Sequence, residues 1–194
     1  MPRYPPDRWF DYAPLGVPVK GTRFLPIKLP IPLEKSYNIP PHLRFTLSDL
    51  IECVHSCNQK LTCVIDLTYA RYYSKKFLRD NNIRYYKIYV EGHKVPDSES
   101  VAQFIDLVNK ERKESPDGII AVHCTHGVNR TGYFICRYLI DFMNINPKDA
   151  LQVHCYLEFE YARGYPVERE NYIEDLLNSV RKPNVISVEA NRRK

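Results

Sequence analysis

The sequence predicts an α/β domain with a central, mostly parallel sheet and helices on both faces. Two observations lead to this class. The segments "LTCVIDLT" (61–68) and "GIIAVHC" (118–124) are short, continuously apolar and rich in β-branched residues, which is typical of strands buried on both faces. Stretches with the apolar spacing of helices alternate with these strands, so we expect right-handed crossover connections.

The elements follow in chain order. Residues 24–29 have strand character, but their prolines confine this strand to a sheet edge. "FTLSDLIECVHSCNQ" predicts a helix with Thr46 or Ser48 as its N-cap, and "IRYYKIYV" (83–90) predicts another strand. A helix is expected to start after "KVPDSES". Later helices are expected at about 130–143, 147–160 and 168–181.

Size and composition suit one globular domain. The chain has 194 residues, of which 44% are hydrophobic and 26% are charged, so it can bury a core without disulfides. We expect a Pro-rich arm over residues 1–41, the main domain over 42–182 and a basic tail over 183–194. No apolar run of about 18 residues indicates a membrane span, and no signal peptide is evident. The six cysteines are interpreted as reduced thiols, which favours an intracellular protein.

The segment "AVHCTHGVNRTGYFICRYLI" (121–140) places a cysteine between a buried strand and a helix. Cys124 follows the strand and the helix is expected to begin near Arg130, so the residues between form a tight loop where α/β sheets bind ligands. Loop amides and the helix dipole converge on one anion there. Gly127 and Gly132 relax the backbone, and Arg130 can chelate two phosphate oxygens.

The same positive field lowers the pKa of a thiol, so Cys124 is predicted to be a thiolate nucleophile. Thr131 is expected to donate to the sulfur, and His123 to orient the loop. The site is therefore predicted to transfer phosphate through a phosphocysteine. The predicted phosphate-binding residues are those of the loop, Thr125, His126, Gly127, Val128, Asn129 and Arg130. For the His126 side chain the alternative is that it only fills the outer face of the loop. We expect no metal and no cofactor, because the His and Cys spacing does not fit zinc and the sequence has no GxxxxGK[ST] motif.

"HCTHGVNRTGYFICRYLID", "VIDLTYARYY", "EGHKVPDSES" and "ARGYPVERENYIEDL" resemble the RNA-directed branch of the dual-specificity phosphatases. This branch includes RNA/ribonucleoprotein-complex-interacting phosphatases, the baculovirus RNA 5′-phosphatase and the triphosphatase domains of animal mRNA capping enzymes. The resemblance spans most of residues 7–177, and only "LQVHCYLEFEYARG" looks longer than its counterpart. It implies the cysteine-dependent phosphatase fold and metal-free removal of phosphates from RNA 5′ ends.

Two carboxylates have open roles. Asp97 is the positional candidate for a general acid, but an Asp at a helix start is more often a cap. Asp66 ends a strand that should reach the same cleft. We favour a supporting role for it, paired with a loop arginine, and the resemblance to capping enzymes marks it as functional either way.

A triphosphate end needs cations beyond the loop. The resemblance places Arg169 beside the loop, which makes it our first choice. Weaker candidates, each by default a solvated surface charge, are Lys28, Arg71, Lys94 and Arg163. Candidates for stacking on the first base, each by default a packing residue, are Tyr72, Tyr73 and Tyr161.

Together with the phosphate loop, the resemblance implies a monomeric RNA 5′-polyphosphatase that removes the γ and then the β phosphate. The net charge of +5 is a mild bias toward polyanions. Expected partners are RNA 5′ triphosphate and diphosphate ends and RNA-processing or ribonucleoprotein complexes, in the nucleus, the cytoplasm or both. Alternatives are a γ-only triphosphatase of the capping type, a protein or phosphoinositide phosphatase, and a module that binds 5′-phosphorylated ends.

Overall fold

The computed structural model describes residues 4–141 and 155–179. Its sheet contains β1 (Phe24–Ile27), β2 (Leu61–Asp66), β3 (Arg84–Lys87) and β4 (Ile119–His123). The strand order is β1-β4-β2-β3, and every neighbouring pair is parallel. The predicted α/β class is confirmed, and β1 lies at the edge that its prolines require.

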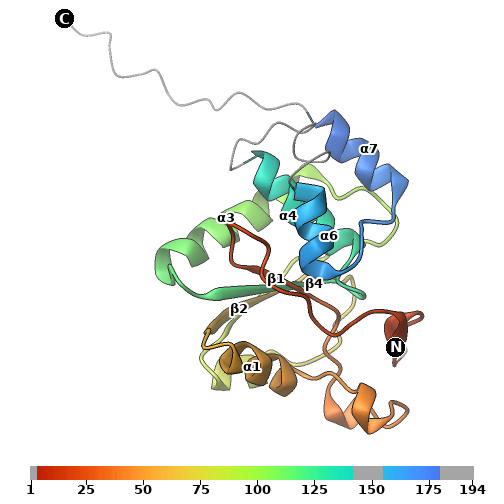
Figure 1. Cartoon of the computed structure of the whole chain (residues 1–194), viewed down its shortest axis with the longest axis vertical. Helices are drawn as coiled ribbons and strands as arrows, with labels where there is room; N and C mark the ends of the chain where they lie inside the picture. Colours follow the sequence, from red (N-terminus) through yellow and green to blue (C-terminus); the bar gives the residue numbers. More distant parts are fainter. Residues whose placement is uncertain (1–3, 142–154, 180–194) are drawn as a thin grey trace, which may run out of the picture.

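Helices cover both faces of this sheet (Figure 1). The helix α1 (Leu47–Ser56) lies on one face, and the short α2 (Lys76–Asp80) packs into the same core. The other face carries α3 (Ser98–Glu114), α4 (Asn129–Asp141), α6 (Cys155–Arg163) and α7 (Glu170–Asn178). Three 3₁₀ turns, Trp9–Asp11, Leu33–Lys35 and Pro41–Leu43, punctuate the first part of the chain. Across the described ranges, no helix is long and apolar enough to cross a membrane.

The strand β4 shows why residues 119–122 of the sequence are all apolar. Ile120 and Val122 belong to the core beneath α3 and α4. Ile119 and Ala121 belong to the core beneath α1. Successive strand residues point to opposite faces, so these four positions all meet a core, and the polar His123 comes only at the carboxyl end of the strand.

Local signals set the helix starts. Thr46 caps α1 in a capping box, in which its hydroxyl accepts from the amide of Asp49 at 3.3 Å and its own amide donates to the Asp49 carboxylate at 2.7 Å. The helices predicted at 130–143 and 168–181 correspond to α4 and α7. Residues 142–143 and 180–181 lie outside the described ranges, and α7 is shorter than predicted, since it begins at Glu170 and ends at Asn178. The helix predicted at 147–160 overlaps α6, which extends to Arg163. Residues 147–154 of the prediction lie outside the described ranges. The short α2 was not predicted, because only Leu78 in it is buried.

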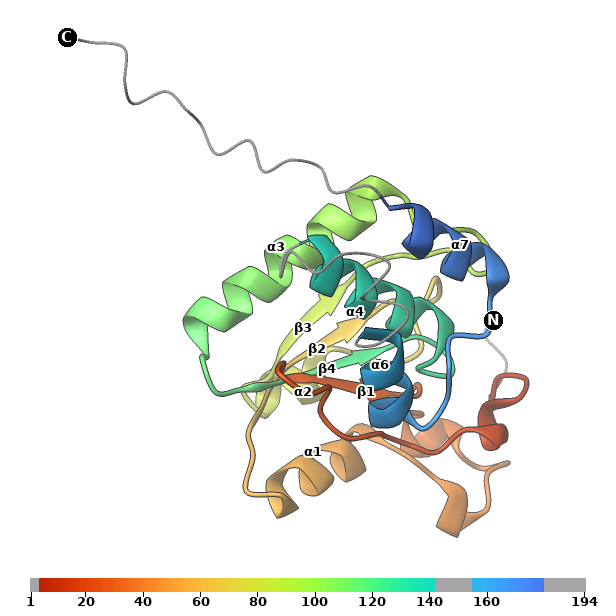
Figure 2. The ribbon, with the colours of Figure 1, turned by 45° about the horizontal axis from the view of Figure 1, so that its top comes forward.

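The described part of the N-terminal arm, residues 4–41, includes β1 and is held to the rest of the domain. Figure 2 shows it running past α6, where the amide of Val17 donates to the carbonyl of Ala162 at 2.7 Å. A Cβ at Gly16 would lie 2.0 Å from the same oxygen, so the arm approaches α6 too closely for any side chain there. Trp9 is buried and donates through Nε1 to the carbonyl of Leu29 at 2.9 Å. The arm is therefore part of the folded domain.

Candidate active site

A row of residues crosses the sheet at the carboxyl ends of its strands. Ile27 pairs with His123, His123 pairs with Asp66, and Asp66 pairs with Lys87. Cys124 follows this row directly. The loop that begins at Cys124 therefore lies at the sheet edge where α/β proteins bind their ligands.

The loop between β4 and α4 packs closely against β1. Gly127 has a φ of +71°, in the left-handed region, and a Cβ there would lie 2.1 Å from the carbonyl oxygen of Ile27. Only glycine fits this position. The amide of Leu29 also donates to the carbonyl of Thr125 at 3.1 Å. Strand β1 thus supports the outer side of the loop.

The thiol of Cys124 is 3% exposed. Burial alone would raise its pKa, but the charge of Arg130, the hydroxyl of Thr131 and the backbone amides of Thr131 and Gly127 outweigh it, and the pKa lies below the usual value of cysteine. These are the groups expected around a cysteine at a helix N-terminus beside a cation. The geometry therefore favours the thiolate, which is the nucleophilic form.

The hydroxyl of Thr131 is available to the sulfur. Its oxygen is buried and has no hydrogen-bond partner among the described residues. It nevertheless lowers the pKa of Cys124, so its hydrogen can be donated to the thiolate. A thiolate that leaves a phosphocysteine needs the same stabilisation.

The guanidinium of Arg130 is fixed by three acceptors. Its Nη1 donates to the carbonyls of Leu67 at 3.1 Å and Val90 at 2.9 Å, and its Nη2 donates to the hydroxyl of Thr125 at 3.0 Å. Leu67 follows β2 and Val90 follows β3, so two strand ends hold the side chain over the loop. Planar guanidinium groups held in this way are suited to bidentate binding of phosphate.

His123 is a neutral, fully buried imidazole. Burial lowers its pKa against the opposing charge of Asp66. Nδ1 lies 3.0 Å from the carbonyl oxygen of Cys124, and because a carbonyl only accepts, Nδ1 carries the hydrogen. Nε2 then accepts from the hydroxyl of Tyr73 at 2.6 Å. The ring holds the Cys124 peptide in one orientation, as the predicted role requires.

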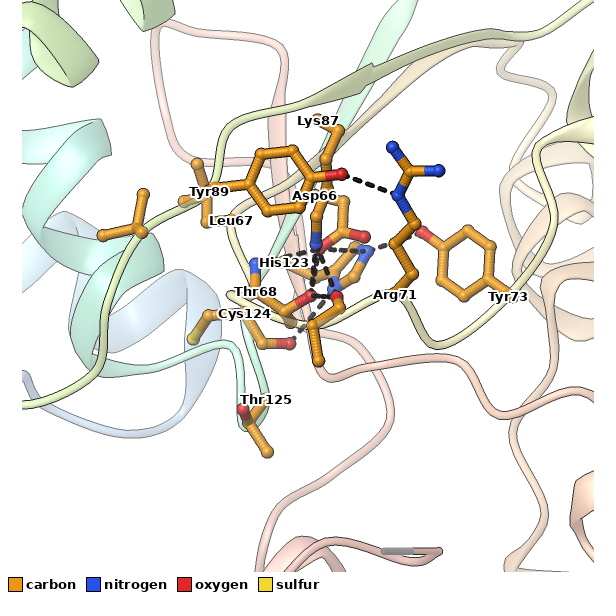
Figure 3. A network of polar contacts seen from close by, with 12 residues as sticks. Asp66, Leu67, Thr68, Arg71, Tyr73, Lys87, Tyr89, His123, Cys124 and Thr125 are labelled. Carbon is orange, nitrogen blue, oxygen red and sulfur yellow. Dashed lines mark hydrogen bonds and ion pairs between the residues drawn. The ribbon is translucent and has the colours of Figure 1, made fainter. Parts of the chain in front are cut away.

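Asp66 is the centre of a buried polar network (Figure 3). It forms an ion pair with Lys87 at 3.0 Å, accepts from the amide and hydroxyl of Thr68 at 2.8 and 2.7 Å, and accepts from the hydroxyl of Tyr85 at 2.9 Å. Burial would raise its pKa, but the charge of Lys87 and the Thr68 bonds hold the pKa below its usual value. The prediction that Asp66 pairs with a loop arginine was wrong. Arg130 donates to backbone carbonyls instead, and the cation that pairs with Asp66 is Lys87.

Asp97 acts as the N-cap of α3. Its Oδ1 accepts from the amide of Ser100 at 2.7 Å. That bond lowers the pKa of the carboxyl, so Asp97 is ionised near neutral pH. A general acid must hold a proton, so the cap is the role that this geometry supports.

Asn129 joins the loop to the start of α7. Its Oδ1 accepts from the amides of Glu168 at 2.8 Å and Arg169 at 3.0 Å. Arg169 therefore lies beside the loop, where the resemblance placed it. Its Nη1 contacts Nδ1 of His93 at 2.8 Å, which sets the guanidinium against the segment that follows β3.

Residues 47–182 match the model of the dual-specificity phosphatase catalytic domain. The chain belongs to the dual-specificity phosphatase family. Its fold, and a cysteine loop between β4 and α4, are those expected of a phosphatase of this kind. In the described part of this phosphatase, no group of three or more His, Cys, Asp or Glu side chains is arranged to hold a metal ion.

Relatives of this dual-specificity phosphatase cover nearly all of it. The RNA/RNP complex-1-interacting phosphatase of Bos taurus is 44% identical over 92% of this chain and 53% of its own length. The chain thus spans about half the length of that relative. The tyrosine-protein phosphatase of Autographa californica nuclear polyhedrosis virus is 34% identical over 89% of this chain and 98% of its own length. A solved protein tyrosine phosphatase from Leishmania major shares the fold, with a TM-score of 0.60 at 16% identity, over 88% of this chain and 98% of its own.

The arm precedes the matched phosphatase domain, yet it contacts the catalytic loop directly. Nε2 of His126 donates to the carbonyl of Asp7 at 2.7 Å, and its ring stacks on Tyr12 with 4.8 Å between centroids. The hydroxyl of Tyr12 donates to Glu168 at 2.8 Å. Of the two alternatives for His126, these contacts favour the one in which the ring fills the outer face of the loop, because the arm occupies the ring. Only its backbone amide remains a candidate ligand.

Arg163 is the buried link between arm and loop. It is 2% exposed. Its Nε donates to the carbonyl of Gly127 at 3.1 Å, and its Nη2 donates to those of His126 and Ala13, both at 2.8 Å. Burial lowers its pKa to about 10. Because these carbonyls point back toward Arg163, the loop amides are free to face the phosphate. Arg163 was a weaker candidate for a cation that lines the approach to the loop. That prediction was wrong, because Arg163 lies behind the loop.

Lys28 is a buried cation that belongs to the arm itself. Its Nζ lies 3.5 Å from the centroid of the Trp9 ring and donates to the carbonyls of Trp9 at 3.2 Å and Tyr12 at 2.9 Å. Burial, followed by the charge of Arg163, lowers its pKa to about 8. Lys28 therefore holds the arm and does not line the approach to the cleft.

Other predicted residues have contacts of their own. The side chain of Val128 is fully buried, so only its backbone can reach a phosphate. Tyr73 bonds to His123, and is therefore no stacking platform. Tyr72 is half-buried against Tyr4 with 5.7 Å between ring centroids, whereas Tyr161 is 83% exposed on α6. Tyr161 keeps an open face, whereas Tyr72 is close enough to Arg130 for that charge to lower its pKa against the larger effect of burial.

Sequence reasoning missed Lys87 and Tyr73 as supports of the site. Lys87 ends β3, in register with Asp66, and a lysine that ends a strand next to a buried carboxylate is a usable signal once the strand order is known. Tyr73 follows β2 by several residues and reaches His123 only through the path of its loop. No local pattern could have paired them.

Proposed function

We propose that this protein is an RNA 5′-polyphosphatase that converts triphosphate ends to monophosphate ends through a phosphocysteine. The observation that carries the proposal is a complete thiolate loop in a chain 44% identical, over 92% of its length, to a phosphatase named for interaction with an RNA/RNP complex. That relative is named for its interaction with RNA, and we extend this to RNA as the substrate of the present chain.

The reaction begins with the γ-phosphate in the loop, held by backbone amides and by Arg130. The thiolate of Cys124 attacks phosphorus, and the bond from phosphorus to the bridging oxygen breaks. That oxygen leaves with the electron pair as part of RNA 5′-diphosphate. Water then attacks the phosphocysteine, releasing inorganic phosphate and a proton, and Thr131 stabilises the departing thiolate. A second round with the β-phosphate leaves the monophosphate end.

The absence of a protonated carboxyl at Asp97 suits this substrate. A tyrosine leaving group has a conjugate-acid pKa of about 10 and needs a general acid. The diphosphate leaving group is a far weaker base, so it departs without a proton from the enzyme. Asp66 then acts by holding Lys87 and Thr68 in place beneath the cleft.

The proposal is tested with a short 5′-triphosphate RNA labelled separately at the γ and β positions, in EDTA. A phosphotyrosyl peptide at equal concentration runs in parallel, and Cys124→Ser serves as the control for contaminating phosphatases. We expect release of both labels, with the peptide much slower. Release of γ alone would indicate a capping-type triphosphatase.

Protein tyrosine phosphatase activity is the second candidate. It is favoured by the viral relative, which is 34% identical over 98% of its own length and is named a tyrosine-protein phosphatase. Faster turnover of the peptide than of the RNA would select this function. The same thiolate chemistry would then act on a different leaving group.

A further inference from the structure

A triphosphate end carries charge on more than the phosphate that enters the loop. Besides Arg169, whose guanidinium contacts His93, the sequence suggested four weaker cations for the remaining phosphates, and the structure separates these four. Lys28 and Arg163 are buried behind the loop. Lys94 pairs with Glu91 at 2.8 Å on the surface. Arg71 differs from these three, because it is exposed and, among the residues described, no carboxylate forms an ion pair with it.

Arg71 is held by an aromatic hydroxyl. Its Nε donates to the hydroxyl of Tyr89 at 2.6 Å, and its guanidinium carbon lies 5.9 Å from the centroid of that ring. Figure 3 shows the outer nitrogens of the guanidinium turned away from Tyr89. Because Tyr89 uses only the Nε hydrogen, the two Nη groups of Arg71 can bind a ligand. Their spacing matches two oxygens of one phosphate.

The partner of Arg71 rests on the buried network of the site. Lys87, which is paired with Asp66, places its Nζ 5.2 Å from the centroid of the Tyr89 ring. Tyr89 is 47% exposed, so one part of the ring meets the network and another part meets solvent. Arg71 is therefore positioned by residues that already serve the active site.

Arg71 and Tyr89 also belong to the two segments that hold Arg130. Nη1 of Arg130 binds the carbonyl of Leu67, which begins the segment leading to Arg71, and the carbonyl of Val90, which follows Tyr89. Lys87 lies within the electrostatic influence of both arginines. Arg71 and Tyr89 thus lie on the same two segments that hold Arg130, at the end of the sheet where β2 and β3 finish.

We propose that Arg71, oriented by Tyr89, binds the second phosphate of the substrate. This is the β-phosphate while the γ-phosphate is in the loop, and the α-phosphate in the second round. The inference rests on the proposed function and adds a specificity residue to it. Arg71 selects a phosphoanhydride chain over a single phosphate monoester, because only the chain reaches both arginines.

The test measures binding to the Cys124→Ser protein, which cannot turn substrate over, by calorimetry. The probes are inorganic phosphate, tripolyphosphate and a short 5′-triphosphate RNA. We expect Arg71→Ala to weaken binding of tripolyphosphate and of the RNA by about tenfold and to leave phosphate unchanged. Tyr89→Phe removes only the acceptor and is expected to weaken the same two by about threefold. Arg79→Ala is the matched control, because Arg79 is an exposed arginine on α2 beside Asp80.

Three outcomes would overturn the inference. Equal weakening of all probes would make Arg71 a support of the cleft. Weakening of RNA alone would assign it to the nucleoside, and unchanged binding would give it no role. Turnover of RNA by the unaltered protein is measured separately. If that fails while tripolyphosphate binding still depends on Arg71, the proposed function falls and the second-phosphate site remains.

Discussion

The catalytic loop and the N-terminal arm touch each other at His126, but their residues are distributed differently along the chain. The reacting groups of the loop, Cys124, Arg130 and Thr131, come from one short stretch and meet through local geometry. The groups that hold the loop come from far apart, with Ala13 and Ile27 before it and Arg163 after it. The reacting groups are therefore encoded by neighbouring residues, whereas the residues that align them are distant in sequence. Substitutions in the two sets should affect activity and stability differently.

The largest expected effect is on the loop. Cys124→Ser should lower turnover of 5′-triphosphate RNA by at least about 10⁴-fold, because a serine hydroxyl is not ionised there. Fold and affinity for RNA should persist, as measured by thermal melting and calorimetry. Retained phosphate release would show that another residue is the nucleophile.

Removing the link between arm and loop should come next. Arg163→Met leaves three carbonyls without their donor, so we expect the free energy of unfolding to fall by about 3 kcal/mol. The loop amides should lose their alignment, which should lower kcat by about 100-fold. Denaturant unfolding and steady-state kinetics measure the two effects.

Lys28→Met is the matched control for this change. Lys28 also binds carbonyls of the arm from a buried position, but its bonds are to Trp9 and Tyr12 and none is to the loop. It should lose stability while keeping kcat. If both variants lose kcat equally, the arm as a whole supports catalysis and the Arg163 bonds to the loop carry no special role.

Thr131→Ala tests the loop at a smaller scale. The Thr131 hydroxyl is one of the groups that hold the pKa of Cys124 below its usual value, so the variant should have a higher thiol pKa. Activity requires the thiolate and is lost as pH falls through that pKa, so the acid limb of kcat/KM should move to higher pH. Alkylation of Cys124 by iodoacetamide across pH should move with it. An unchanged limb would remove Thr131 from control of the thiol.

The smallest expected effect is on the arm. Tyr12→Phe keeps the ring that stacks on His126 and removes only the bond to Glu168. The free energy of unfolding should fall by about 1 kcal/mol, with kcat/KM within about twofold of the unaltered protein. A large loss of kcat would mean that Glu168 positions the loop as strongly as Arg163 does.

The sequence alone determined the parts that depend on neighbours in the chain. Residues 119–122 of β4 are apolar because both faces of the strand are covered, the side chains of Thr46 and Asp97 are cap candidates for amides a few residues ahead, and Cys124 meets Arg130 within one loop. Period, capping and tight turns act over a few residues, so a single sequence displays them.

Only the tertiary structure decided which distant groups hold that loop. It paired Asp66 with Lys87 rather than with an arginine, gave the ring of His126 to the arm and placed Arg163 behind the loop. The sequence around a charged residue does not show whether its side chain is solvated or buried. Its burial and its partners depend on strand order and on the path of the arm, which bring together residues more than a hundred positions apart.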